Sequence, residues 1–313
     1  IRRKVILTMT SLPELCLKNF RKTGYARNVL KEKICLSRRK LKGGSLYVLC
    51  KKCNGRFIFG LDQDHRLALF ENIHPIPQVC PTMLFAEDEQ TVLFDTVDWS
   101  ACRQLLENLD YLLGDRQLDV LLINHMEPDH GASIEEILLR YPKCKVISTE
   151  KAFMFMRQFG FDIDEHELIE VSEGDTYCFG AHTVTFVSAP MVHWPEAMVT
   201  LDVTNGVLFS ADAFGSFIAL DGKLFNDEVN FDRDWLDEAR RYYTNIVGKY
   251  GPQVQLLLGK AAAVLDKIKI ICPLHGPVWH TELGYIIDKY QHWSTYTPED
   301  SDGVMVVYAS MYG

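Results

Sequence analysis

The stretch His-Met-Glu-Pro-Asp-His at residues 125–130 decides the fold of this chain. A run at 118–123 that is apolar except for Asp119 precedes it and predicts a buried strand. Burying acids and imidazoles without partners costs free energy, so their crowding after a strand favours a metal site over a solvated polar turn. Loops at strand ends are also where α/β folds place their sites. The candidate ligands are His125, Glu127, Asp129 and His130.

Three more ligand-type residues occur later in matching contexts. Each of them follows a predicted strand: His193, Asp212 and His275. Two neighbouring cations need carboxylates to offset their repulsion, and one carboxylate to bridge them. The seven residues together therefore predict a two-metal site. Five of the six other histidines lack this context and are expected to be structural or surface residues: His65, His74, His182, His280 and His292.

Hydrophobic spacing predicts strands and helices in two groups, each ending in helices. The predicted strands are 45–50, 55–59, 83–86, 91–95, 118–123, 145–148, 183–188, 197–202, 206–210 and 268–272. The predicted helices are 98–113, 133–140, 150–159, 234–248 and 251–267. Ser133 and Glu136 fit a capping box at the start of the second helix. Two groups of this kind predict two sheets packed together with helices outside.

The composition limits the functional classes. The 313 residues are 47% hydrophobic and 24% charged, as in folded globular proteins. No apolar run approaches the roughly 18 residues of a membrane span, and no signal peptide stands out. The nine scattered cysteines favour a reducing cytoplasm over a disulfide framework. The lone C-x-x-C at Cys50 and Cys53 is a weak zinc or redox signal.

The net charge of -9 is unevenly distributed. Residues 1–54 hold 15 of the 33 Lys and Arg but only two acids, a net +13, which leaves -22 on the remainder. A basic arm can contact nucleic acid or direct targeting. Because it contains no recognisable binding motif, a poorly ordered extension is the favoured interpretation. The acidic remainder argues against nucleic-acid binding by the main domain.

A boundary is expected near the end of the chain. Residues 294–303 are polar and rich in turn formers, which predicts a linker. Residues 304–308 then begin a new apolar strand, so the sequence is expected to stop at the start of a further domain. The expected organisation is a basic extension at 1–54, a main domain at 55–297, and a linker with the start of another domain at 298–313.

The ligand pattern resembles the metallo-β-lactamase fold. Hydrolases of that fold usually have His at the third position of the first motif, where this chain has Glu127, and this change resembles the flavodiiron proteins (A-type flavoproteins). The resemblance covers about residues 57–313 and includes LFENIHPIP at 69–77, HWPEAM at 193–198 and PLHGPVW at 273–279. It implies an α+β, metallo-β-lactamase-like αββα sandwich followed by the first strand of a flavodoxin-like domain.

The resemblance also implies roles for the ligands. One iron would be bound by His125, Glu127 and His193, and the other by Asp129, His130 and His275. Asp212 would bridge the irons, and Asp212 with His130 would be the catalytic residues. A carboxylate in place of an imidazole hardens the site, which favours iron over zinc. Trp194, Phe214 and Phe217 flank the ligands and either shield the site or are ordinary core aromatics.

The implied reaction is reduction of O2 to water, of NO to N2O, or both, with electrons delivered through FMN. VMVVYASMYG at 304–313 resembles the first strand of the FMN-binding domain, with Ser310 and Gly313 beginning its phosphate-binding loop. The implied partners are an electron-donor protein, such as rubredoxin or a reductase, and a second copy of the chain in a head-to-tail homodimer.

Two alternatives remain open at this stage. A hydrolase of the same fold would use zinc or manganese to activate water and would need no flavin. An inactive remnant would only dimerise and would bind no metal. The metal content of the purified chain distinguishes the alternatives: iron supports the redox interpretation, zinc or manganese the hydrolase, and no metal the inactive remnant.

Overall fold

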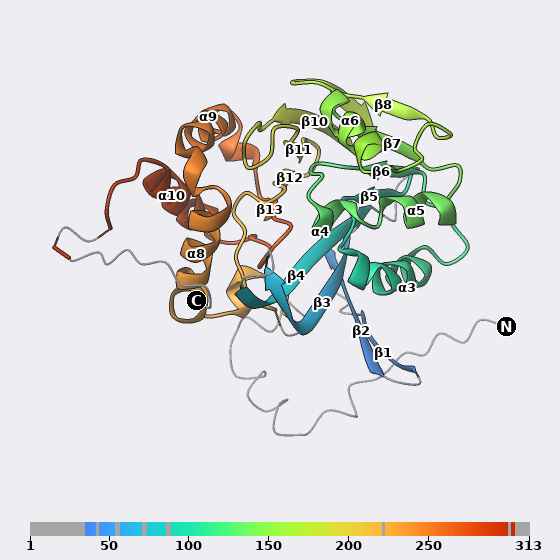
Figure 1. The fold of residues 1–313 in the computed structure, drawn as a ribbon, viewed down its shortest axis with the longest axis horizontal. Helices are drawn as coiled ribbons and strands as arrows, with labels where there is room; N and C mark the ends of the chain where they lie inside the picture. Colours follow the sequence, from blue (N-terminus) through green and yellow to red (C-terminus); the bar gives the residue numbers. More distant parts are fainter. Residues whose placement is uncertain are drawn as a thin grey trace.

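Two β-sheets lie face to face, with helices covering the outer face of each (Figure 1). The structure is a computed structural model that describes residues 35–41, 44–53, 57–70, 74–85, 89–220, 223–299 and 302–303, with the backbone alone up to residue 85. No helix among these residues has the length and apolar character needed to cross a membrane. The architecture is the α+β sandwich expected from the sequence.

The first sheet has eight strands in chain order. They are β1 (Cys35–Leu41), β2 (Gly44–Cys53), β3 (Phe57–Phe70), β4 (His74–Phe85), β5 (Val92–Phe94), β6 (Val120–Leu122), β7 (Lys145–Ser148) and β8 (Leu168–Glu170). Neighbours from β1 to β5 are antiparallel, and those from β5 to β8 are parallel. β1 and β2 fall within the stretch predicted as a basic extension and pair in register into this sheet. The boundary at residue 54 stays a prediction.

The second sheet has five strands in the order β13-β12-β11-β10-β9. They are β9 (Thr176–Cys178), β10 (Thr183–Ser188), β11 (Met198–Asp202), β12 (Val207–Phe209) and β13 (Ile270–Cys272). β12 and β13 are parallel, whereas the other pairs are antiparallel. The carboxyl ends of β12 and β13 therefore meet at one edge, which the functional site uses.

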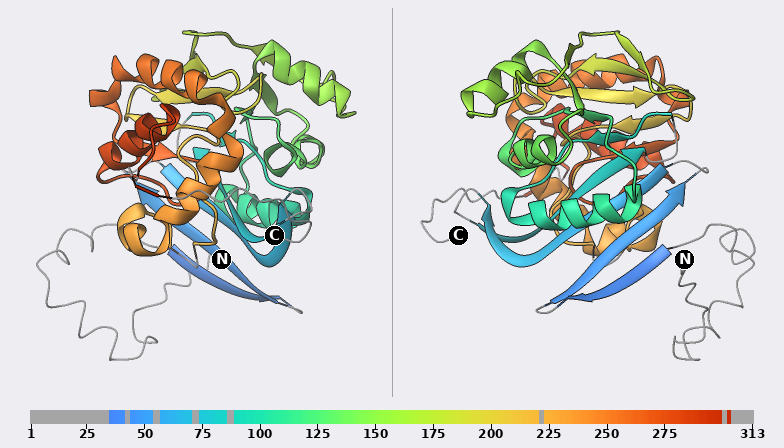
Figure 2. Two further views of the ribbon diagram at one scale, coloured as in Figure 1. Left: turned by 60° about the vertical axis from the view of Figure 1, so that its left-hand side comes forward. Right: turned by 90° about the vertical axis from the view of Figure 1, so that its right-hand side faces the viewer.

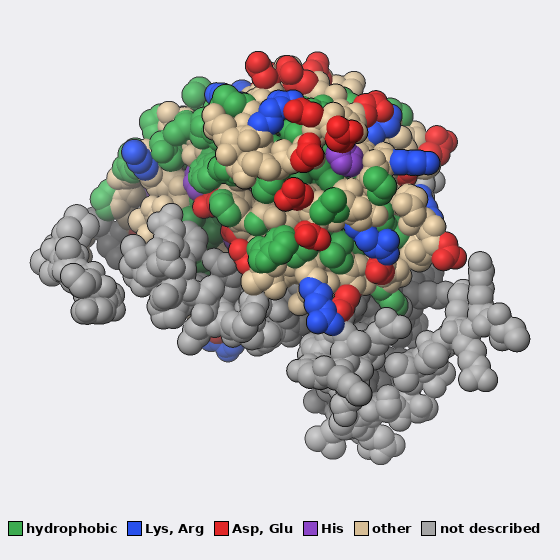
Figure 3. Space-filling model, turned by 45° about the vertical axis from the view of Figure 1, so that its right-hand side comes forward, with side chains coloured by type: hydrophobic (Ala, Val, Ile, Leu, Met, Phe, Trp, Pro, Cys, Tyr) green, Lys and Arg blue, Asp and Glu red, His purple; other side chains and the backbone are tan. Residues whose placement is uncertain are grey.

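Helices cover the two outer faces, as Figure 2 shows from the side. The first sheet carries η2 (Trp99–Ala101), α3 (Cys102–Leu113), α4 (Pro128–Gly131), α5 (Ile134–Arg140) and α6 (Glu150–Gln158). The second carries η3 (Asn226–Glu228), α7 (Phe231–Asp234), α8 (Leu236–Ile246), η4 (Gly248–Tyr250), α9 (Gly251–Ala262), η5 (Leu265–Lys267) and α10 (Leu283–Ser294). On the face shown in Figure 3, acidic side chains are spread among Lys and Arg.

The period-two alternation of the strands divides the core into layers. In β5, Val92 and Phe94 face the second sheet, whereas Leu93 faces α3, α5 and α6. The rings of Phe94 and Phe209 stack across the two sheets, with centroids 3.8 Å apart and planes 8° from parallel. A third apolar layer joins the second sheet to α8, α9 and α10. The stacked pair ties β5 to β12, and both strands end next to the candidate site.

Each predicted strand and helix of the described region has a counterpart, and most ends are shifted by a few residues. The predictions 55–59 and 83–86 were too short, because β3 continues to Phe70 and β4 already begins at His74. The capping box is wrong, because the Ser133 hydroxyl donates to the carbonyl of Val97 at 2.8 Å and does not cap α5. Several elements were not predicted: β1, β8, β9, α4, α7 and α10. β8 and β9 are three-residue strands without a buried side chain, so they carry a weak hydrophobic pattern.

Candidate metal centre

Four strand ends bring the seven predicted ligands together. β6 leads into residues 125–130, which continue as α4, and His193 lies in the loop between β10 and β11. Asp212 and His275 follow the parallel strands β12 and β13. Two clusters result, and the ligand atoms within each lie within 4.8 Å of one another. The predicted convergence of distant strand ends is therefore observed.

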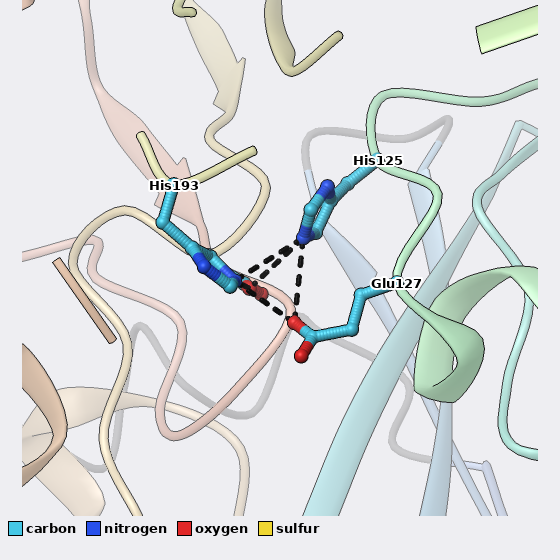
Figure 4. A group of neighbouring side chains, drawn as sticks. His125, Glu127 and His193 are labelled. Atoms are coloured by element: carbon cyan, nitrogen blue, oxygen red, sulfur yellow. Dashed lines mark hydrogen bonds and ion pairs between the residues drawn. The ribbon is translucent and has the colours of Figure 1, made fainter. Parts of the chain in front are cut away.

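The first cluster contains His125, Glu127, His193 and Asp212. In Figure 4 the side chains of His125, Glu127 and His193 point toward one another. The Nε2 atom of His193 is 2.8 Å from Glu127 Oε2 and 3.3 Å from the Nε2 atom of His125. Two imidazole lone pairs aimed at one point repel unless a proton or cation lies between them. This donor set fits a cation with nitrogen and oxygen ligands.

The second cluster contains Asp129, His130 and His275. The Nε2 atoms of His130 and His275 are 3.0 Å apart, and His275 Nε2 is 3.1 Å from Asp129 Oδ2. The two histidines are buried, and Asp129 is half-buried at the rim. This cluster offers imidazole nitrogens and a carboxylate oxygen, as the first cluster does, so a second cation fits here.

Asp212 lies between the clusters. Its Oδ2 atom is 3.0 Å from His193 Nε2, whereas its Oδ1 atom is 3.1 Å from His130 Nε2. The side chain is 1% exposed, and each carboxylate oxygen faces a different cluster. This is the geometry of a carboxylate that bridges two metals.

The carboxylates raise the pKa of three ligand histidines in the metal-free chain, that of His125, despite its burial, well above its usual value through Asp212, Glu127 and Glu196. Burial alone would lower the pKa of His130, but Asp129 and Asp212 raise that pKa to about 9. Burial also opposes protonation of His193, yet hydrogen bonds to Asp212 and Glu127 raise its pKa to about 9. Metal can bind only after these protons leave.

We therefore expect metal uptake to release protons and to tighten with pH. Between pH 6 and about 9, each imidazolium must lose its proton before it binds, so the apparent affinity rises; above about 9 it levels off. Titration of the metal-free chain with Zn2+ in weakly buffered solution measures the number of protons released and the apparent metal affinity. Uptake that releases no protons at pH 7 would contradict this charge state.

A buried carboxylate holds the start of the ligand loop in place. Asp95, after β5, accepts hydrogen bonds from the backbone N–H of Asn124 at 2.7 Å and of His125 at 3.1 Å. Its other oxygen accepts from the Asn124 side-chain amide at 2.8 Å. Sequence reasoning missed this role, because Asp95 was included as the last residue of the predicted strand 91–95, whereas β5 ends at Phe94.

We expect Asp95→Ala to lower the free energy of unfolding by about 2–4 kcal/mol, because it leaves buried donors unpaired. Urea unfolding of the metal-free chain measures the effect. Asp98→Ala is the matched control in the same segment, since Asp98 accepts one exposed backbone N–H, from Ser100 at 2.8 Å. Equal losses in the two variants would refute the structural role of Asp95.

The aromatic residues that flank the ligands in the sequence, Trp194, Phe214 and Phe217, lie in different surroundings. The Trp194 ring contacts His125 edge-on, with centroids 5.5 Å apart, and Phe155 similarly at 6.1 Å. Phe214 and Phe217 are buried in the layer between the second sheet and its helices. Trp194 therefore packs on a candidate ligand, whereas the two phenylalanines are core residues.

Tyr242 on α8 lies beside the second cluster. Its ring centroid is 5.3 Å from that of His275, and the residue is 1% exposed. Burial and the nearby Asp212 carboxylate raise the pKa of Tyr242 well above its usual value. Its hydroxyl has no hydrogen-bond partner among the described residues. The phenol thus keeps its proton close to the three site carboxylates.

Other predicted positions lie outside this centre. Ser310 and Gly313 are beyond the described residues, and so are the side chains of Cys50, Cys53, His65 and His74. His280 pairs with Asp227 at 2.8 Å, which agrees with the structural role expected for it.

The paired clusters on an αββα sandwich define the class as a metallo-β-lactamase-like domain with a potential binuclear metal site. Residues 79–276 match the family described as ODP family beta lactamase. The chain belongs to this family, the metallo-β-lactamase-like domain of flavodiiron proteins.

Named relatives agree with this assignment. The chain is 32% identical over 223 residues to an anaerobic nitric oxide reductase flavorubredoxin of Aeromonas salmonicida, covering 71% of this chain and 42% of the relative. It is 33% identical over 207 residues to a nitric oxide reductase of Moorella thermoacetica, covering 66% and 51%. The solved rubredoxin oxygen:oxidoreductase of Desulfovibrio gigas has a TM-score of 0.73 and 26% identity, covering 80% and 62%. The chain thus spans about half the length of these curated relatives.

Proposed function

We propose that this chain is the di-iron domain of an oxidoreductase that reduces O2 to water, NO to N2O, or both. The observation that carries the proposal is the position of Asp212, whose two oxygens face two histidine-carboxylate clusters. Glu127 supports iron, because it adds a hard oxygen ligand where related hydrolases have an imidazole. The relatives named as nitric oxide reductases support the same chemistry.

The seven candidate ligands would have different roles at the two ions. Two bound iron ions would supply the electrons to the gas and hold it in place, which makes its reaction effectively intramolecular. His125, Glu127 and His193 would hold one ion and Asp129, His130 and His275 the other, while Asp212 would set their spacing. Three carboxylates offset most of the charge of two divalent cations in a buried site.

Reduction of either gas consumes protons as well as electrons. Tyr242 keeps a proton at Oη beside the second cluster, since burial and Asp212 raise its pKa well above the usual value. Met126 and Ala213, which are next to candidate ligands in the sequence, are buried apolar residues.

Electrons would reach the site through FMN. In this proposal residues 304–313, with Ser310 and Gly313, begin the flavodoxin-like domain that binds it. An electron-donor protein such as rubredoxin or a reductase would reduce the flavin, and a head-to-tail homodimer would bring the FMN of one subunit to the irons of the other. The greater length of the curated relatives leaves room for such a domain.

Single-turnover gas reduction tests the proposal without any flavin. The chain is loaded anaerobically with Fe2+ and mixed with NO, and N2O is measured by gas chromatography. Two ferrous ions supply the two electrons that convert two NO and two protons into N2O and water, so we expect one N2O per site.

The alternatives predict different outcomes. A Zn2+-loaded sample that hydrolyses an ester or thioester, together with an Fe2+-loaded sample that neither forms N2O nor consumes O2, would support a hydrolase and overturn the proposal. A folded sample that binds neither metal would support an inactive remnant instead.

A further inference from the structure

The ring of His125 is held from the side opposite the cluster. Its Nε2 atom faces His193 at 3.3 Å, whereas its Nδ1 atom is 2.9 Å from Oε1 of Glu196. The side chains of His125 and Glu196 are both 0% exposed. Oε1 of Glu196 also accepts the backbone N–H of Met126 at 2.9 Å. A carboxylate has no proton to give at such a contact, so Nδ1–H is the donor, and Nε2 is the ring nitrogen left to face the cluster.

Glu196 is itself held by several elements. Its carbonyl accepts from the hydroxyl of Thr149 at 3.3 Å, and Thr149 caps α6 by accepting from the Ala152 N–H at 3.2 Å. The neighbouring Ala197 carbonyl accepts the N–H of Ala189 at 2.9 Å. The backbone at Glu196 and Ala197 is therefore tied to the end of β7, the start of α6 and the loop between β10 and β11. The Glu196 carboxylate is not a ligand itself, because the imidazole ring separates it from the cluster.

The two clusters differ in the hydrogen-bond partner of the Nδ1 atom of a buried ligand histidine. The Nδ1 atom of buried His130 in the second cluster has no hydrogen-bond partner within the described residues. Behind His125, by contrast, stands a buried carboxylate. A carboxylate that accepts the second N–H of a ligand histidine fixes its tautomer and raises its basicity as a ligand.

We propose that Glu196 is a positioning residue that fixes the tautomer of His125 and makes the first metal position the tighter of the two. This inference rests on the proposed two-metal function and adds an order of filling to it. The first equivalent of metal enters the cluster of His125, Glu127 and His193, and the second enters the cluster of His130 and His275.

The test is a titration of the full metal-free chain with Co2+, whose visible spectrum reports the ligands, in three variants. Glu196→Ala removes the acceptor and is expected to weaken the tighter step by about 10-fold to 100-fold. Glu196→Gln keeps an oxygen that can accept from Nδ1–H, so its loss should be smaller. Glu150→Gln, an exposed change on α6, is the control and should match the unaltered chain. The looser step should change little in any variant.

Nitrogen NMR of the Zn2+-loaded chain gives a second readout that folding alone would not move. We expect His125 to be protonated at Nδ1 in the unaltered chain and in Glu196→Gln, with its exchangeable Nδ1–H protected from solvent. Loss of that protection in folded Glu196→Ala supports the proposal.

The failures are distinguishable. An unaltered chain that binds no metal overturns the proposed two-metal function. Two-step binding in the unaltered chain with the same affinities in Glu196→Ala overturns the role of Glu196 alone. A His125 protonated at Nε2 in the loaded chain also overturns it. If Glu196→Ala does not fold, Glu196→Gln decides: no weakening of the tighter step, together with an unprotected Nδ1–H, contradicts the proposal.

Discussion

Asp212→Ala is expected to reduce the metal content from two ions per chain to at most one and to lower NO reduction at least 10²-fold, as ~3 kcal/mol of lost stabilisation would. The physical reason is that one side chain serves both clusters, with oxygens 3.0 Å from His193 Nε2 and 3.1 Å from His130 Nε2. Its removal leaves two cations without the anion between them. Metal analysis after anaerobic Fe2+ loading, followed by the single-turnover assay, measures both effects.

Asp212→Asn is the matched control for this result. The amide keeps the shape and one oxygen but replaces the other with an NH2 group, which cannot bind a cation. We expect one metal to remain and the two-metal reaction to be lost. An Asp212→Ala chain that retains two ions at unaltered affinity would show that this residue is not a bridge.

Phe209→Ala is expected to lower the free energy of unfolding by about 3–5 kcal/mol, as for other buried aromatic residues. Phe209 stacks on Phe94 at 3.8 Å in the layer between the sheets, so its loss leaves a cavity where β5 meets β12. Denaturant unfolding of the metal-free chain measures the change. Metal affinity should also fall, because β12 leads directly into Asp212.

Two controls separate packing from the general effect of losing a ring. Phe209→Leu keeps most of the volume and should cost less than about 1.5 kcal/mol. Phe159→Ala removes a ring that is 46% exposed and should cost less still. A Phe209→Ala loss no larger than that of Phe159→Ala would contradict the two-sheet packing.

The sequence was sufficient to predict the two sheets and the convergence of the ligands. Most of the ligands follow a strand that is largely apolar, such as 118–123 before His125 or IKIICPL before His275. Buried strands of this kind carry a clear pattern, and strand ends in one layer meet at a common edge. The signal is local in sequence, so it needs no knowledge of packing.

The supporting residues could not be predicted in the same way. Asp95 and Glu196 hold the His125 loop from distances of 30 and 71 residues along the chain, and only the folded packing shows which acid meets which donor. α10 is different, because Ile286, Tyr290 and Trp293 have helical spacing and are buried. That helix was within reach of the hydrophobic pattern.

Mössbauer spectroscopy of the chain loaded anaerobically with 57Fe2+ tests the central claim most directly. A carboxylate-bridged pair in a nitrogen and oxygen environment predicts two high-spin ferrous ions per chain, coupled to each other and absent from Asp212→Ala. A single uncoupled iron, or no bound iron in a folded chain, would contradict the account.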